Sequence, residues 1–168
     1  MMRKCCCLAV LVLPWSPLPA WAEHANIDLS VSRLDPAGGA VKGEVSSSAD
    51  SEPPAGGHTP RPLLKVRAGE PLVLQFFFTN TYPHGDLKGV TVSYFIVREE
   101  KPRQANLPDL SRGVITQGRF TLNFKPKGRA GARVRFTIPT PGFYLVRVQS
   151  GNTQSDHEHF SALDLQVE

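Results

Sequence analysis

Residues 139–148 read PTPGFYLVRV, and this stretch decides the fold class of the chain. Its Pro-Thr-Pro-Gly start predicts a tight turn, because proline fixes φ and glycine accepts backbone conformations that other residues avoid. The apolar and β-branched residues that follow predict a strand over 143–150. A turn that leads directly into such a strand favours an all-β domain.

The same criteria predict strands on both sides of this stretch. These runs are rich in Val, Ile, Phe, Tyr, Leu and Thr, and several alternate apolar with polar residues. They cover 63–67, 71–80, 89–98, 113–124 with a break at Gln117-Gly118, 132–138 and 159–167. No segment has a helical period, because Pro and Gly interrupt each candidate. About seven short strands within about 100 residues are typical of an antiparallel β-sandwich.

The Pro-Gly-Phe-Tyr segment resembles the turn and penultimate strand of immunoglobulin-like and fibronectin-III-like domains. The resemblance implies an immunoglobulin-like sandwich over 63–168, with the hydroxyl of Tyr144 closing the corner before its strand. Val146 stands where many immunoglobulin domains have the second disulfide cysteine. We therefore expect no disulfide between the sheets, as in fibronectin-III-like domains. The resemblance implies nothing specific about function.

The strand layout also resembles that of the cupredoxins, in which a His-bearing loop follows a late strand. Their blue copper site needs a cysteine thiolate and usually an axial methionine. All three Cys and both Met of this chain lie within its first 22 residues, which we expect to be removed. A blue copper centre is therefore excluded for the mature chain.

Residues 1–22 have the features of an export signal, namely Arg3 and Lys4, a short apolar run and a final Ala-Trp-Ala. The apolar run is too short to span a bilayer, so we expect cleavage after Ala22, a secreted or periplasmic protein and no integral membrane segment. We predict a short strand within 23–34, a flexible Gly/Pro/Ser-rich linker over 35–62 and the sandwich over 63–168. A folded ligand-binding loop is the alternative for 35–62.

The net charge of the mature chain is small. From residue 23 onward, 17 Lys and Arg face 15 Asp and Glu. No clustered basic patch of the kind that nucleic-acid binding requires is evident, and we expect no nucleic-acid partner. The Glu99-Glu100-Lys101 run and the basic stretch 125–135 are interpreted as solvated faces.

Two polar loops hold the residues that are capable of chemistry. In an immunoglobulin-like topology the loops 79–88 and 151–158 lie at one end of the sandwich, beside the basic loop 125–131. Imidazole and carboxylate groups suit Zn²⁺ or Cu²⁺, and a His-x-His spacing puts both rings on one side of an extended segment. The candidate metal ligands are His84, Asp86, Asp156, His157 and His159.

Other interpretations of these loops stay open. Asp and His are ordinary loop residues, and the same loop end fits a protein- or glycan-interaction module without metal or catalysis. A metal-dependent enzyme with an open coordination position is a third hypothesis. Nucleophilic catalysis is disfavoured, because the chain has no Gly-x-Ser-x-Gly motif and its mature part has no Cys. We therefore expect a binding protein rather than an enzyme.

Overall fold

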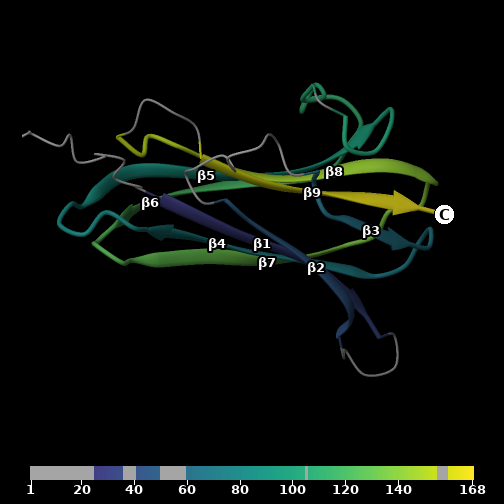
Figure 1. Cartoon of the computed structure of the whole chain (residues 1–168), viewed down its shortest axis with the longest axis horizontal. Coiled ribbons are helices and arrows are strands. Elements are labelled where there is room, and N and C mark those ends of the chain that lie inside the picture. Colours follow the sequence, from purple (N-terminus) through teal and green to yellow (C-terminus); the bar gives the residue numbers. More distant parts are fainter. Residues whose placement is uncertain (1–24, 36–40, 50–59, 105, 155–158) are drawn as a thin grey trace, which may run out of the picture.

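A computed structural model describes residues 25–35, 41–49, 60–104, 106–154 and 159–168. In this part of the chain every regular element is a strand, and two layers of strands face each other (Figure 1). The strands are β1 (Ala25–Leu34), β2 (Val41–Ala49), β3 (Leu63–Val66), β4 (Leu72–Asn80), β5 (Leu87–Glu99), β6 (Val114–Phe124), β7 (Arg129–Phe136), β8 (Gly142–Gly151) and β9 (His159–Val167). The predicted all-β sandwich is confirmed.

The two sheets have the strand orders β2-β1-β4-β7 and β3-β9-β8-β5-β6. Neighbouring strands are antiparallel except β3, which runs parallel to β9 from Leu63↔Asp164 to Val66↔Val167. Within the described ranges no helix is long and apolar enough to cross a membrane.

The core lies between the sheets and follows from period-2 alternation. Side chains at every second position of each strand point inward, and the rings of Phe78 and Phe124 meet across the layers at 4.7 Å. The inward rows include Val90, Val92 and Ile96 on β5, and Leu72, Leu74, Phe76 and Phe78 on β4.

The corner before β8 has the predicted hydrogen bond. Tyr144 is buried, and its hydroxyl donates to the Thr140 carbonyl oxygen at 2.8 Å. This bond fixes the turn against the start of the strand that the opening motif predicts.

Strand β6 differs from its predicted form, because it runs through Gln117-Gly118 without a break. Both residues remain in register with β5, as Gly118↔Tyr94 and Gln117↔Phe95. A Cβ atom on Gly118 would lie 2.6 Å from the Tyr94 ring, so this glycine makes room for an aromatic neighbour rather than ending the strand.

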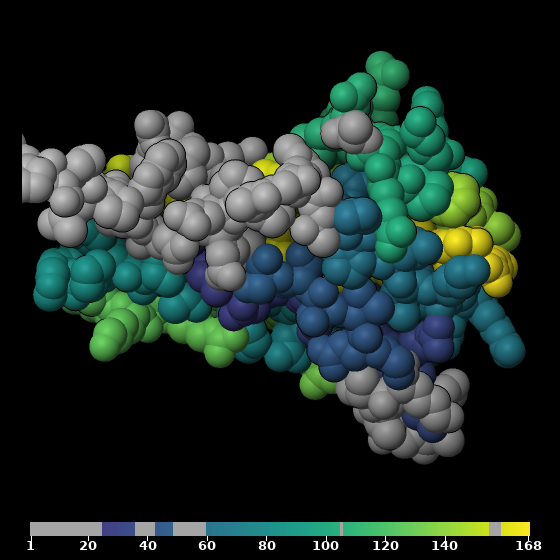
Figure 2. Space-filling view, in the orientation of Figure 1, coloured from purple at the N-terminus to yellow at the C-terminus, as the bar shows by residue number. Residues whose placement is uncertain are grey.

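A strand is present within 23–34 as predicted, but this strand and part of the predicted linker belong to the sandwich instead of preceding it. β1 lies inside the four-stranded sheet, paired with β4 from Ala25↔Asn80 to Arg33↔Leu72. β2 falls in the stretch predicted as linker and pairs with the free edge of β1. Figure 2 shows β2 at the surface beside β1. The rest of that stretch up to residue 59, and the predicted signal 1–22, lie outside the described residues.

Candidate functional site

The described parts of the loops that were predicted to meet at one end of the sandwich do lie together there. The β4–β5 loop, the β6–β7 turn and the end of β8 lie together at the left of Figure 1. Asn80 joins two of them: its buried amide nitrogen donates to the carbonyl oxygens of Gly85 at 2.9 Å and Lys125 at 3.1 Å. The amide of Asn152 reaches the Gly89 carbonyl oxygen at 3.3 Å. Asn80 was not among the residues predicted from the sequence to be functional.

The predicted metal ligands occupy different environments at this end. His84 is exposed. His159 begins β9 at an inward-facing position, and the residue is only 4% exposed. The Asp86 carboxylate forms an ion pair of 2.6 Å with Lys125. Asp156 and His157 lie outside the described residues. Among the residues that are described, no three His, Cys, Asp or Glu side chains form a metal-binding group. The metal site stays a prediction.

A buried charged group lies at the opposite end of the five-stranded sheet, on its outer face. Arg61 donates from Nε to Asp164 at 2.7 Å and from Nη2 to Glu99 at 2.8 Å. Both carboxylate side chains are 0% exposed. The second oxygen of Asp164 accepts from the main-chain nitrogen of Arg103 at 2.6 Å. One guanidinium thus links the segment before β3, strand β5 and strand β9.

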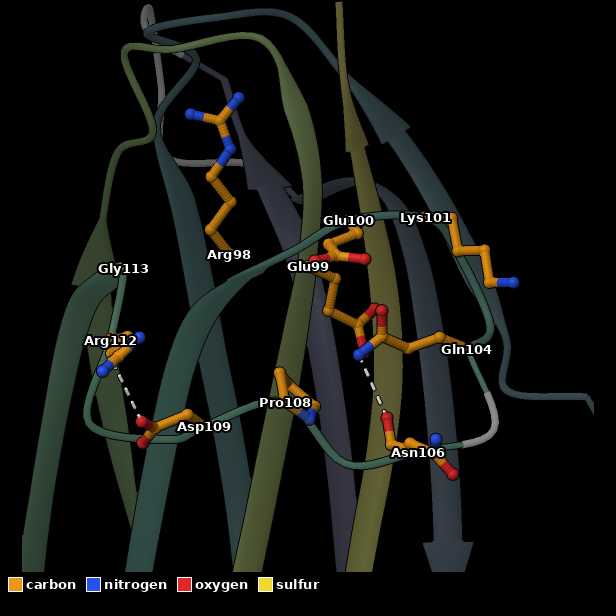
Figure 3. Close-up of a pocket in the computed structure, with 10 residues that line it drawn as sticks. All are labelled: Arg98, Glu99, Glu100, Lys101, Gln104, Asn106, Pro108, Asp109, Arg112 and Gly113. Carbon is orange, nitrogen blue, oxygen red and sulfur yellow. Dashed lines mark hydrogen bonds and ion pairs between the residues drawn. The ribbon is translucent and has the colours of Figure 1, made fainter.

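The chain between β5 and β6 covers this end of the outer face. Leu110 packs with Val97, Leu145 and Ala162 in a small apolar cluster of its own. A cavity of about 790 Å³ lies beside this covering segment. Figure 3 shows the residues that line it: Arg98, Glu99, Glu100, Lys101, Gln104, Asn106, Pro108, Asp109, Arg112 and Gly113.

The electrostatics of the cavity centre on Glu99. Burial away from water raises the pKa of the Glu99 carboxyl from 4.5 to about 7. The Arg61 charge lowers this pKa and the Asp164 charge raises it, and both effects are smaller than that of burial. Glu99 Oε2 is buried and has no hydrogen-bond partner among the described residues.

The interpretation of Glu99 as part of a solvated face was wrong. Glu99 follows Val97 on the outward side of β5, and alternation alone places that side in water. The irregular segment between β5 and β6 covers it instead. The available signal was the apolar content of that segment, Leu107 and Leu110, which a purely solvated loop does not need.

The outer face of the four-stranded sheet is polar and slightly hollow. The Arg129 guanidinium lies 3.9 Å from the centre of the Phe77 ring and pairs with Asp28 at 3.2 Å. Ser48 also donates to Asp28, at 3.0 Å. A hollow of about 310 Å³ is lined by Asp28, Leu29, Ser30, Ser46, Ser47, Ser48, Gln75, Phe77 and Arg129.

The edge strand β7 adds positive charge to this face. Its register with β4 pairs Val73↔Arg135 and Gln75↔Arg133, and its inward positions hold small or apolar residues. Arg133 and Arg135 are exposed, and neither has an ion pair within the described ranges. The interpretation of 125–135 as a solvated face agrees with this exposure.

No known family of sequences matches the chain, and no curated protein matches it either. Solved structures do resemble it. The soluble domain of PmoD from Methylocystis sp. ATCC 49242 is 15% identical, with a TM-score of 0.46 over 84% of this chain and 90% of that one. The C-terminal domain of Wzt is 12% identical, with a TM-score of 0.45 over 87% and 74%.

A chitin-binding domain from Burkholderia pseudomallei is 19% identical, with a TM-score of 0.37 over 62% of this chain and 56% of that domain. At such identities and TM-scores, these likenesses concern β-rich architecture and assign no activity.

Proposed function

We propose that the protein is an exported binding module that holds an acidic polysaccharide against the outer face of the four-stranded sheet. The observation that carries the proposal is the pair Arg133 and Arg135, which project from β7 without an ion-pair partner in the described chain. A guanidinium group presents a planar fork of donors that matches a carboxylate or sulfate group. Export rests on the predicted signal over 1–22.

The rest of the face suits a hydroxyl-rich ligand. Ser30 and Ser46 line the hollow beside Gln75, and hydroxyl and amide groups both donate and accept hydrogen bonds. Arg129 over Phe77 closes one side of the hollow with a flat, charged surface. Sugar hydroxyls and a uronate carboxylate would therefore find matching groups within one face.

The same face is poorly suited to a protein partner. Protein interfaces depend on aromatic or large apolar residues buried at their centre. The large hydrophobic side chains most exposed in the described chain are Leu107, Leu122 and Phe160, and all three belong to other elements. On this face Phe77 is half-buried under Arg129. Charge and hydroxyl groups dominate the surface that remains.

The test is an affinity measurement with a soluble polyuronate such as alginate, with neutral dextran as the matched polymer. We expect Arg133→Gln/Arg135→Gln to weaken alginate binding about tenfold, since exposed ion pairs contribute up to about 1 kcal/mol each. The control Lys88→Gln/Arg119→Gln also removes two exposed charges, but from strands of the other sheet. It should bind like wild type.

Two results would contradict the proposal. Equal weakening by both double variants would show general attraction between charges and not a site on β7. Unchanged binding by Arg133→Gln/Arg135→Gln, with self-association in size-exclusion chromatography, would show that the arginines only protect an exposed sheet edge from pairing with other chains.

The metal hypothesis remains a separate prediction for the loop end. His84 and Asp86 lie in the β4–β5 loop, whereas Asp156 and His157 lie outside the described residues. Zn²⁺ or Cu²⁺ would be the ligand, and catalysis is not part of either proposal.

A further inference from the structure

The two buried carboxylates that pair with Arg61 differ in the number of hydrogen bonds that they accept. Asp164 accepts a hydrogen bond at each oxygen, from Arg61 Nε and from the Arg103 main chain. Glu99 accepts only at Oε1, from Arg61 Nη2 at 2.8 Å. Its Oε2 is buried without a partner among the described residues. A buried acceptor left in this way costs about 1–3 kcal/mol, and more when it is charged.

The group is also unbalanced in charge. One guanidinium faces two carboxylates that are withdrawn from water, so an ionised Glu99 leaves one negative charge without a counterion. Burial accordingly raises the pKa of Glu99 to about 7, and a proton neutralises the group below that pH. A bound cation would provide the same neutralisation above it.

The space beside Glu99 is of the right size for a small ligand. Its volume of about 790 Å³ falls within the range of about 300–1,000 Å³ that is typical of ligand pockets. The basic residues of the lining do not compete for Glu99. Arg112 pairs with Asp109 at 3.2 Å, and Figure 3 shows Arg98 and Lys101 extending away from the Glu99 carboxylate.

The cavity lining also includes two amide side chains, those of Gln104 and Asn106. Gln104 donates from Nε2 to the Asn106 carbonyl oxygen at 3.0 Å, so both residues border the cavity in a fixed relation. The side-chain oxygens of Gln104 and Asn106 are acceptors for further N–H donors. Carboxylate and amide oxygens in one cavity suit a group that carries several donors and a positive charge.

We propose that this cavity binds a small primary ammonium ion, with one N–H donated to Glu99 Oε2 and others to the Gln104 and Asn106 amides. The association is non-covalent and is independent of the polysaccharide proposal, since it uses the other sheet. When Glu99 is protonated, binding releases that proton to solvent.

The experiment is an NMR titration of the full chain with butylammonium at pH 8, followed at the backbone amides of Glu99, Gln104 and Asn106. We expect saturable shifts at these amides. Tetramethylammonium carries the same charge but has no N–H donor, and it should produce none. Glu99→Gln keeps the shape and removes the charge, so it should bind at least tenfold more weakly. Glu44→Gln removes an exposed carboxylate from β2 of the other sheet, away from the cavity, and should bind like wild type.

The affinity for the ammonium ion should also decrease as the pH is lowered. The charged groups that face Glu99 are Arg61 and Asp164, which come from the segment before β3 and from β9. Because Glu99 titrates near pH 7, the affinity at pH 6 should be about tenfold lower than at pH 8.

Three results would overturn the proposal: no shifts at these amides up to about 20 mM ligand, equal binding of tetramethylammonium, or equal binding by Glu99→Gln.

Discussion

Glu99 shows how a single side chain takes its chemistry from what covers it. It shares Arg61 with Asp164, yet only Asp164 has both oxygens hydrogen-bonded. Glu99 therefore holds a proton to near neutral pH because burial penalises its charged form. Folding stability depends on pH through such a group, since the folded and unfolded chains bind different numbers of protons.

The pKa of Glu99 predicts the sign of that dependence. The unfolded chain releases the Glu99 proton near pH 4.5, whereas the folded chain keeps it to about pH 7. The stability from this residue is fully present below pH 4.5 and is lost as the pH rises to about 7. The loss is at most about 3.5 kcal/mol, at about 1.4 kcal/mol per pKa unit.

Urea denaturation at pH 5 and pH 8 measures this effect as a difference between variants. Relative to wild type, Glu99→Gln should gain stability between the two pH values, because it has no carboxyl to titrate. Glu100→Gln is the control, since this neighbour is exposed. If the difference between Glu99→Gln and wild type were the same at both pH values, the assignment of the raised pKa would be wrong.

At the scale of elements, the sandwich depends on glycines that bring strands close together. A Cβ atom on Gly131 of β7 would lie 1.9 Å from the Phe76 carbonyl oxygen on β4. Gly151 at the end of β8 has open space at the same position. Both residues have ordinary φ values, so the two positions differ in neighbours and not in backbone conformation.

This contrast predicts different costs for the same substitution. Gly131→Ala should lower the free energy of unfolding by about 2 kcal/mol or more, because a backbone oxygen has to move and the β4–β7 ladder with it. Gly151→Ala should change it by less than about 0.5 kcal/mol. Thermal and urea unfolding of both variants provide the measurement. Equal destabilisation would show that the β4–β7 pairing tolerates the added methyl group.

Strands with their own apolar face were predictable from the sequence, and those without one were not. β4, β5 and β8 bury alternate or continuous apolar residues, so their period and bounds are visible in the chain. β2 reads VKGEVSSSA and pairs with β1 through backbone hydrogen bonds, and Val45 packs on the core. An edge strand of this kind has a weak side-chain signature.

Of the two candidate sites, one was likewise predictable from the sequence and the other was not. The loop end was predictable because strand order determines which loops meet. The Arg61–Glu99–Asp164 group was not, because it joins residues 38 and 103 positions apart in the chain under an irregular covering segment. Alternation places Glu99 on an outward face, and only the tertiary structure shows that this face is covered.

At the scale of the whole molecule, β1 determines where the folded unit begins. It lies between β2 and β4 in the four-stranded sheet. Residues from 63 onward therefore supply only β4 and β7 of that sheet. Ile27, Leu29 and Val31 are each 2% exposed or less within the common core. Burial of three such side chains contributes about 5–9 kcal/mol, which is comparable to the whole stability of a typical domain.

A fragment of residues 60–168 should therefore fail to fold, although it contains the entire predicted sandwich over 63–168. Without β1, the inward residues of β4 lose their neighbours on one side, and the β4 edge is left open to pair with other chains. We expect poor amide dispersion in NMR spectra and aggregation. Residues 25–168 should give dispersed spectra and one cooperative unfolding transition. A monomeric, cooperatively unfolding 60–168 fragment would show that β1 is an accessory strand and that the folded unit begins near Leu63.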